Sequence, residues 1–268
     1  MVKTDYKYEL YFGNDIKLTD NITIHQPTIR NIFEYEPHNN LSNTEEQTND
    51  SDKAFECGEQ GFLKMIALLT VSPADYDVQL EDAGVRYEDV DKLDFFFSII
   101  HMYNLSSDLT YPIFGDLNLM AFERFEDSEK KSIVYVNPDG IRIDKLFYEY
   151  LIGIIRTMFN LSENKTTWKN ETSRQMHFDI ERKRLKHKHH KQDKQILIPI
   201  ISMLINLPGF KYDREHILDL NIYFFYDCLK QSMHYSQVDH LMTGVYVGLI
   251  DTKKMNLEES LNMIRNDI

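Results

Sequence analysis

Apolar residues recur at helical spacing along much of this sequence, and this periodicity constrains the fold more than any other feature. Leu93, Phe96, Phe97 and Ile100 fall at i, i+3, i+4 and i+7, which places them on one face of a helix. The chain has only 10 glycines and 7 prolines, too few for a loop-rich β-sandwich. We therefore expect an α+β, mainly α-helical fold with a few short strands.

The first 36 residues are expected to form a short N-terminal β-meander followed by one short helix. Residues 6–12 alternate in polarity, and residues 16–18 and 22–25 are short apolar runs between turn-forming residues. Thr28 is placed to cap the helix. The buried face of that helix would carry Ile29, Ile32 and Phe33.

Residues 54–160 are expected to form a helical domain that contains one β-hairpin. Its first three helices would span residues 54–71, 73–84 and 88–103. The turn sequence NPDG predicts a hairpin over residues 133–143. Asp144 then caps an amphipathic helix. The residues expected to be buried on that helix are Leu146, Phe147, Tyr150, Leu151, Ile154, Ile155 and Phe159.

Residues 161–268 are expected to form a further helical region. A long helix over residues 170–206 would be interrupted or kinked at Pro199, because proline lacks an amide donor and clashes with the preceding turn. The remaining helices are expected near residues 213–219, 221–236 and 237–248, with a last one beginning at Asn256. Sequence alone leaves open whether the chain has one domain or two.

Residues 37–53 differ sharply from their surroundings. Leu41 is the one large apolar side chain in a stretch of Asn, Asp, Glu, Ser and Thr. Such a segment buries too little surface to offset the entropy of ordering it. We predict a flexible polar linker or loop.

Charge is distributed unevenly along the chain. The net charge is −13, yet residues 182–194 (RKRLKHKHHKQDK) hold seven Lys or Arg and one acid, a local charge of +6. The rest of the chain therefore carries −19, a charge that repels nucleic acid and anionic membranes outside this segment.

Three interpretations of the basic segment stay open. A solvated helix face is favoured, and contact with an anionic partner, protein or nucleic acid, is the alternative. His187 and His190 are three apart on a helix, but two imidazoles among lysines are a poor metal site, so no metal is expected. The candidate partner or anion contacts are Arg182, Lys183, Arg184, Lys186, Lys188 and Lys191.

The sequence carries no motif typical of an enzyme, such as GxSxG, a P-loop, GxGxxG, HExxH or CxxC. We therefore expect no catalytic residue and no cofactor. Gly244 and Gly248 form a GxxxG spacing, which in a chain without a membrane span favours close helix packing, with Gly248 ending the helix.

Several features indicate a cytoplasmic protein. Residues 1–10 lack the apolar core of a signal peptide. The longest apolar run, over residues 196–207, is shorter than the ~20 residues that span a bilayer. Cys57 and Cys228 are far apart and lack metal-site spacing, as expected in a reducing compartment.

Three stretches together resemble a known protein family. They are LYFGN with QPTI (residues 10–14 and 26–29), GFKY (209–212) and DHLMTGVYVG (239–248). In this order they resemble tail assembly chaperones encoded by tailed phages and prophages of Gram-positive bacteria. The resemblance spans nearly the whole chain, although residues 37–53 are longer and more polar than the family suggests.

The resemblance implies a non-enzymatic role in virion morphogenesis, in the cytoplasm of an infected or lysogenic host cell. The implied protein partners are the tape measure protein and the tail tube protein, which would contact apolar helix faces. Two alternatives stay open: a nucleic-acid-associated phage regulator that uses the basic helix 182–194, and a structural tail or head adaptor. The oligomeric state is not predicted.

Overall fold

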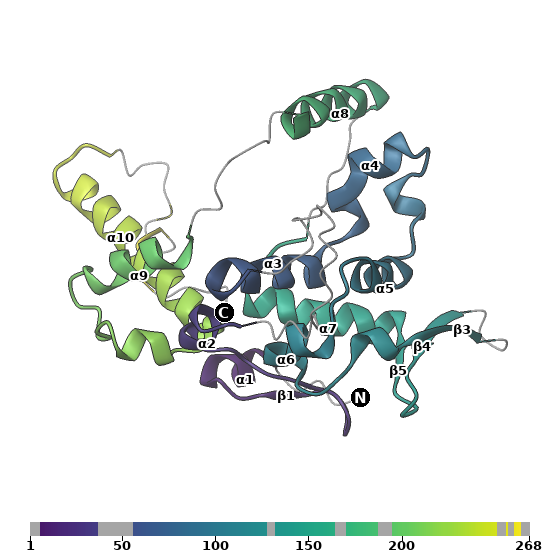
Figure 1. Ribbon diagram of the computed structural model, residues 1–268. Coiled ribbons are helices and arrows are strands. Elements are labelled where there is room, and N and C mark those ends of the chain that lie inside the picture. The colour runs from purple at the N-terminus through teal and green to yellow at the C-terminus, as the bar shows by residue number, and fades with distance from the viewer. Residues whose placement is uncertain are drawn as a thin grey trace.

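The computed structural model describes residues 6–36, 56–127, 132–163, 170–186, 195–250, 256 and 260–263. Helices dominate, and the strands form two small antiparallel sheets, so the predicted α+β, mainly helical class is confirmed (Figure 1). The predicted linker at residues 37–53 lies outside the described residues. No described helix is long and apolar enough to cross a membrane.

The predicted β-meander is wrong in its first segment. Residues Tyr6–Phe12 form helix α1, because Leu10 is fully buried and Tyr6, one turn earlier, packs edge-on against Tyr150. The alternation of this heptapeptide is therefore overridden by an i, i+4 apolar face. Strands β1 (Ile16–Lys17) and β2 (Thr23–Ile24) do pair, with Ile16 opposite Ile24.

Helix α2 (Ile29–Phe33) joins the N-terminal region to the last third of the chain. Thr28 caps it as predicted and accepts a hydrogen bond from the Asn31 amide. The Ile29 amide donates to the Leu220 carbonyl over 3.0 Å. Arg30 pairs with Asp219 at 2.8 Å. These contacts make residues 6–36 and the C-terminal helices neighbours in space.

The core lies between helices α3 (Gly58–Thr70), α5 (Lys92–Met102) and α7 (Lys145–Met158). The predicted burial of the α5 stripe is confirmed. On α7 one expectation is wrong: Leu146 is 74% exposed, because it points some 140° away from Leu151 around the helix. The residues buried on α7 are Tyr148, Leu151, Ile152, Ile154, Ile155 and Met158.

The predicted hairpin is part of a three-stranded sheet with the order β3-β4-β5. Strand β3 (Glu123–Asp127) was not predicted, since ERFED is charged and lacks the composition of a strand. It pairs with β4 (Ser132–Val136), which pairs with β5 (Arg142–Asp144). The stacking of Tyr135 on Phe97, with ring centroids 3.8 Å apart, holds the sheet against α5.

Short helical segments complete the body. Helix α6 (Ser107–Phe114) was also missed, since Pro112 lies inside it. The others are η1 (Pro73–Tyr76), α4 (Asp77–Asp82), η2 (Tyr87–Asp89), η3 (Leu119–Ala121) and η4 (His216–Asp219).

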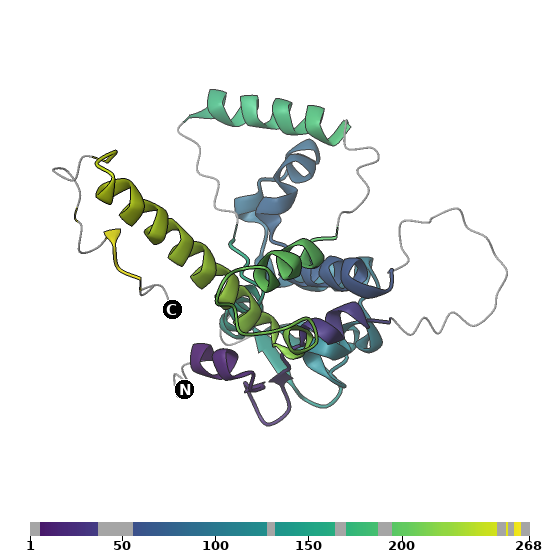
Figure 2. The same cartoon turned by 90° about the vertical axis from the view of Figure 1, so that its left-hand side faces the viewer.

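The last part of the chain differs from prediction in two ways. The predicted long helix appears as α8 (Glu171–Lys186) and α9 (Leu197–Ile205). Pro199 lies in the first turn of α9, where its missing amide donor removes no intrahelical hydrogen bond. Helix α10 (Ile222–Tyr246) is continuous where two helices were expected, and it projects from the body (Figures 1 and 2). The helix expected from Asn256 lies largely outside the described residues.

Candidate functional site

The basic helix is docked on the protein's own acidic residues. Figures 1 and 2 both show α8 beside α4. Arg182 pairs with Asp82 at 2.6 Å and with Asp179 at 3.2 Å. Arg184 pairs with Glu181 at 3.3 Å. Two of the predicted partner contacts are thus already engaged within the chain.

Further contacts hold α8 against α4. Arg174 pairs with Glu81 at 2.5 Å, and His177 lies 3.3 Å from Asp77. Phe178 is 3% exposed, and the guanidinium groups of Arg174 and Arg182 lie 5.3 and 5.9 Å from its ring centroid. Helix α8 therefore has an inner face that is ionic and aromatic.

Among the described side chains of the basic segment, Lys183 makes no ion pair and is exposed to solvent. The Lys186 side chain, Lys188 and Lys191 lie outside the described part of the structure. The histidines of this segment, His187, His189 and His190, also lie outside it. Among the described residues, no group of three or more His, Cys, Asp or Glu could hold a metal ion.

The two glycines of the GxxxG spacing lie at the end of α10. Gly248 has φ +73°, and the Leu249 amide donates to the Gly244 carbonyl over 3.0 Å, which is a Schellman arrangement. A Cβ on Gly244 would lie 2.6 Å from Ile250 Cδ1. The close approach at Gly244 is thus to the residues that follow the helix.

A groove lies where α3, the end of α7, the start of α9 and α10 meet, and we call it the junction groove. Its larger part has a volume of about 390 Å³. Apolar side chains dominate this part, and it is also bordered by Thr70, Asp75 and Ser162. The apolar members are Leu63, Ile66, Ala67, Val71, Phe159, Leu161 and Ile196.

Two apolar residues stand at the edge of the junction groove in open contact with solvent. Leu161 is 42% exposed and Ile196 is 54% exposed. Large side chains left this open beside an apolar groove are typical of an interaction surface.

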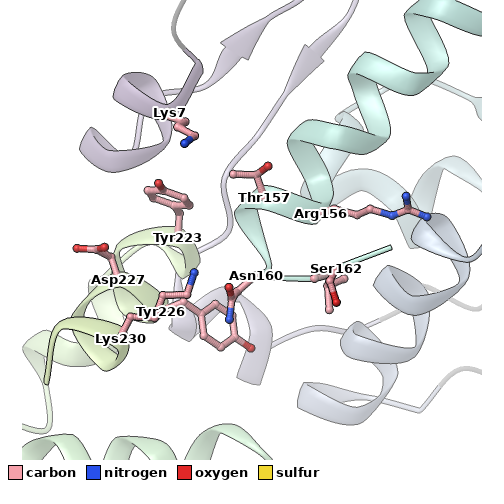
Figure 3. Close-up of a pocket in the computed structure, with 10 residues that line it drawn as sticks. Lys7, Arg156, Thr157, Asn160, Ser162, Tyr223, Tyr226, Asp227 and Lys230 are labelled. Carbon is pink, nitrogen blue, oxygen red and sulfur yellow. The ribbon is translucent and has the colours of Figure 1, made fainter. Parts of the chain in front are cut away.

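The smaller part of the groove is polar and has a volume of about 190 Å³ (Figure 3). It shares Arg156, Leu161, Ser162 and Tyr226 with the apolar part, so the two parts are adjacent. The remaining residues that line it are Lys7, Thr157, Asn160, Tyr223, Asp227 and Lys230.

Long-range contacts fix the walls of the groove. The Glu59 carboxylate on α3 is 6% exposed and accepts hydrogen bonds from the amides of Ile196 and Leu197, at 2.6 and 2.7 Å. It thereby satisfies amides at the start of α9. Arg156 donates to the Thr70 carbonyl over 2.6 Å and lies 3.7 Å from Glu163. These bonds hold α9 and the end of α7 against α3.

Burial alters the titration of two side chains on α10 near the groove. It raises the pKa of the Tyr226 phenol, and the negative charge of Glu59 adds to the increase. Burial also raises the pKa of the Cys228 thiol to about 11, with a further contribution from Asp227. Both groups are therefore neutral at pH 7. Tyr226 presents a hydroxyl rather than a charge to the groove.

None of the groove residues was proposed as a site residue from the sequence, and Phe159 was expected only to be buried on its helix. Lys7 and Lys230 are isolated lysines with ordinary neighbours, and they meet only because α1 packs on α10. The apolar wall of α3 does follow helical spacing, at Leu63, Ile66 and Ala67. Helical spacing of apolar residues does not distinguish a helix face that lines a groove from one that is buried in the core.

A comparison with models of protein families finds a match to the last part of the chain. Residues 190–265 match the family model described as the YomV second domain. That domain family is of phage origin. The matched residues include α9 and α10, which form two of the helical walls of the groove, and the match is consistent with a phage protein. No curated protein and no solved structure matches the chain.

Proposed function

We propose that this chain is a non-enzymatic phage tail assembly chaperone that binds an apolar helical segment of a partner in the junction groove. The proposed partners are the tape measure protein and the tail tube protein during virion morphogenesis. The observation that carries the proposal is the open apolar groove formed by α3, α7, α9 and α10, with exposed Leu161 and Ile196 at its edge.

The shape and chemistry of the groove favour a helix over a small molecule. Small-molecule sites usually enclose about 300–1,000 Å³ and bury most of their ligand around a few converging polar groups. The apolar part, at about 390 Å³, is near the low end of that range, and it opens beside solvent-exposed apolar residues. An amphipathic helix binds such a groove through apolar anchors at i, i+3, i+4 and i+7.

Two further observations support a role in phage assembly. The phage-derived domain match includes two helical walls of the groove. The net charge of −13 would help to keep a complex with an aggregation-prone apolar segment in solution. A nucleic-acid regulator is less well supported, because Arg182 and Arg184 are paired with carboxylates of the same chain.

Co-expression with the tape measure protein of the same phage tests this proposal. We expect the wild-type chain to keep that protein in the soluble fraction and to co-purify with it. Ala67→Glu places a charge in the apolar wall at an exposed position and should abolish both effects. Leu146→Glu, at an exposed position on the far end of α7, is the matched control and should have no effect. An Ala67→Glu variant that folds and still solubilises the partner would refute the proposal.

A further inference from the structure

The polar end of the junction groove contains two lysines without ion-pair partners among the described residues. They are Lys7 on α1 and Lys230 on α10, which border the same 190 Å³ space. Figure 3 shows both ammonium groups directed toward the space beside Tyr223 and Asn160. Arg156 points away from them, toward the Thr70 carbonyl that accepts its hydrogen bond.

The two lysines border one space in a chain that is acidic overall. There are 43 Asp and Glu residues for 30 Lys and Arg, so carboxylates are available to most cations. Helix α8 illustrates this, since three of its arginines pair with carboxylates. The lining of the polar part contains three cations and one carboxylate, Asp227, whose side chain points away from Lys230 in Figure 3.

The positive charge at the polar end of the junction groove favours a partner segment with acidic residues at that end. The residues Arg156 and Tyr226 line both parts of the groove, so a helix that fills the apolar part and continues past them would enter the space between the two lysines. A basic residue at that end would be placed beside two like charges, whereas a carboxylate would form charge-assisted hydrogen bonds with them. Such a charge at the rim acts chiefly on specificity and on the rate of association.

We infer that the segment bound in the junction groove is an acidic amphipathic helix, with its carboxylates at Lys7 and Lys230 and its apolar side chains against α3. This inference rests on the proposed function, because it specifies the partner chemistry of the same groove. The two lysines would make the groove prefer an acidic helical segment over a basic one.

Two designed peptides with the same dye and the same Leu positions at i, i+3, i+4 and i+7 test the inference. One carries Glu and the other Lys on the polar face and at the flanking positions. In fluorescence anisotropy at low salt, the Glu peptide should bind the full-length chain more tightly. The double variant Lys7→Glu/Lys230→Glu should weaken Glu-peptide binding by about tenfold, as expected for two partly exposed pairs, and should strengthen Lys-peptide binding.

Three controls separate the possible outcomes. Lys7→Gln/Lys230→Gln removes the charges with little change in shape and should give an intermediate effect. Lys145→Glu/Lys183→Glu makes the same change in net charge at exposed lysines outside the groove and should leave the preference unchanged. Circular dichroism establishes that each variant is folded.

Each result bears on a different statement. If wild type binds the two peptides equally and Ala67→Glu binds neither, the charge inference is overturned. The proposal that the groove binds a helix then stands. Failure of wild type to bind either peptide would overturn the proposed function together with the inference. A Lys-peptide preference in wild type would overturn the inference directly.

Discussion

At the scale of single residues, Glu59 makes the most consequential contact. Its carboxylate is buried on α3 and accepts from two amides at the start of α9, 137 and 138 positions further along the chain. No local sequence signal identifies it, since a glutamate in the first turn of a helix is ordinarily solvent-exposed and favoured by the helix dipole. Its role depends entirely on which helix packs above it.

Replacing Glu59 tests this contact. Glu59→Ala leaves two amides without their acceptor and should lower the free energy of unfolding by about 1–3 kcal/mol. Glu59→Gln retains an acceptor oxygen and should cost less than the alanine substitution. Urea denaturation followed by circular dichroism measures both. Equal stability of Glu59→Ala and wild type would show that α9 is held by its apolar contacts alone.

The two cysteines should differ in reactivity. Cys57 is exposed, whereas burial raises the pKa of Cys228 from 9.0 to about 11. At pH 8 roughly one Cys228 in a thousand is a thiolate, so a thiol reagent should label one cysteine quickly and the other only on unfolding. Cys57→Ser should remove the fast phase. A fast phase that persists in that variant would contradict the partial burial of Cys228.

The raised pKa of Cys228 also has a consequence for stability. Between pH 9 and pH 11 the unfolded thiol has lost its proton while the folded one retains it. The folded state then binds more protons, so this group lowers the free energy of unfolding as pH rises through that interval. A smaller alkaline loss of stability in Cys228→Ala than in wild type is expected in urea titrations at pH 8 and pH 10.

At the scale of elements, the contact between α8 and α4 is the one most dependent on charge. Glu81→Lys/Asp82→Lys should release α8, because Arg174 and Arg182 would then face like charges. We expect amide hydrogen exchange over residues 171–186 to become about tenfold faster, and exchange in α10 to stay unchanged. Unchanged exchange in α8 would show that the helix is held without these two ion pairs, by contacts such as those of Phe178 and His177.

Elements with a clear helical stripe could be predicted, and elements defined by their neighbours could not. The α5 stripe and the Asp144 cap were found from spacing and capping chemistry. Helix α1 was assigned as a strand because residues 6–10 alternate in polarity, and its packing against α10 favours the helix instead. Strand β3 carries mostly charged side chains, and β4 supplies its pairing partner.

At the scale of the whole molecule, the N- and C-terminal regions of the chain form one structure around the groove. Helix α1 contributes Lys7 and α10 contributes Lys230, while α3 supplies the apolar wall. Residues this far apart in sequence meet through the packing of α2 on η4 and of α1 on α10. The candidate site was therefore beyond reach of sequence patterns, whereas the fold class was not.

The central claim is that a partner helix lies against α3 in the junction groove. A photo-crosslinking amino acid at Ala67, in a chain co-expressed with the tape measure and tail tube proteins of the same phage, tests it most directly. We predict a crosslink to one of these proteins from position 67 and none from the same amino acid placed at Leu146. Crosslinks that form equally at both positions, or only at Leu146, would contradict the claim.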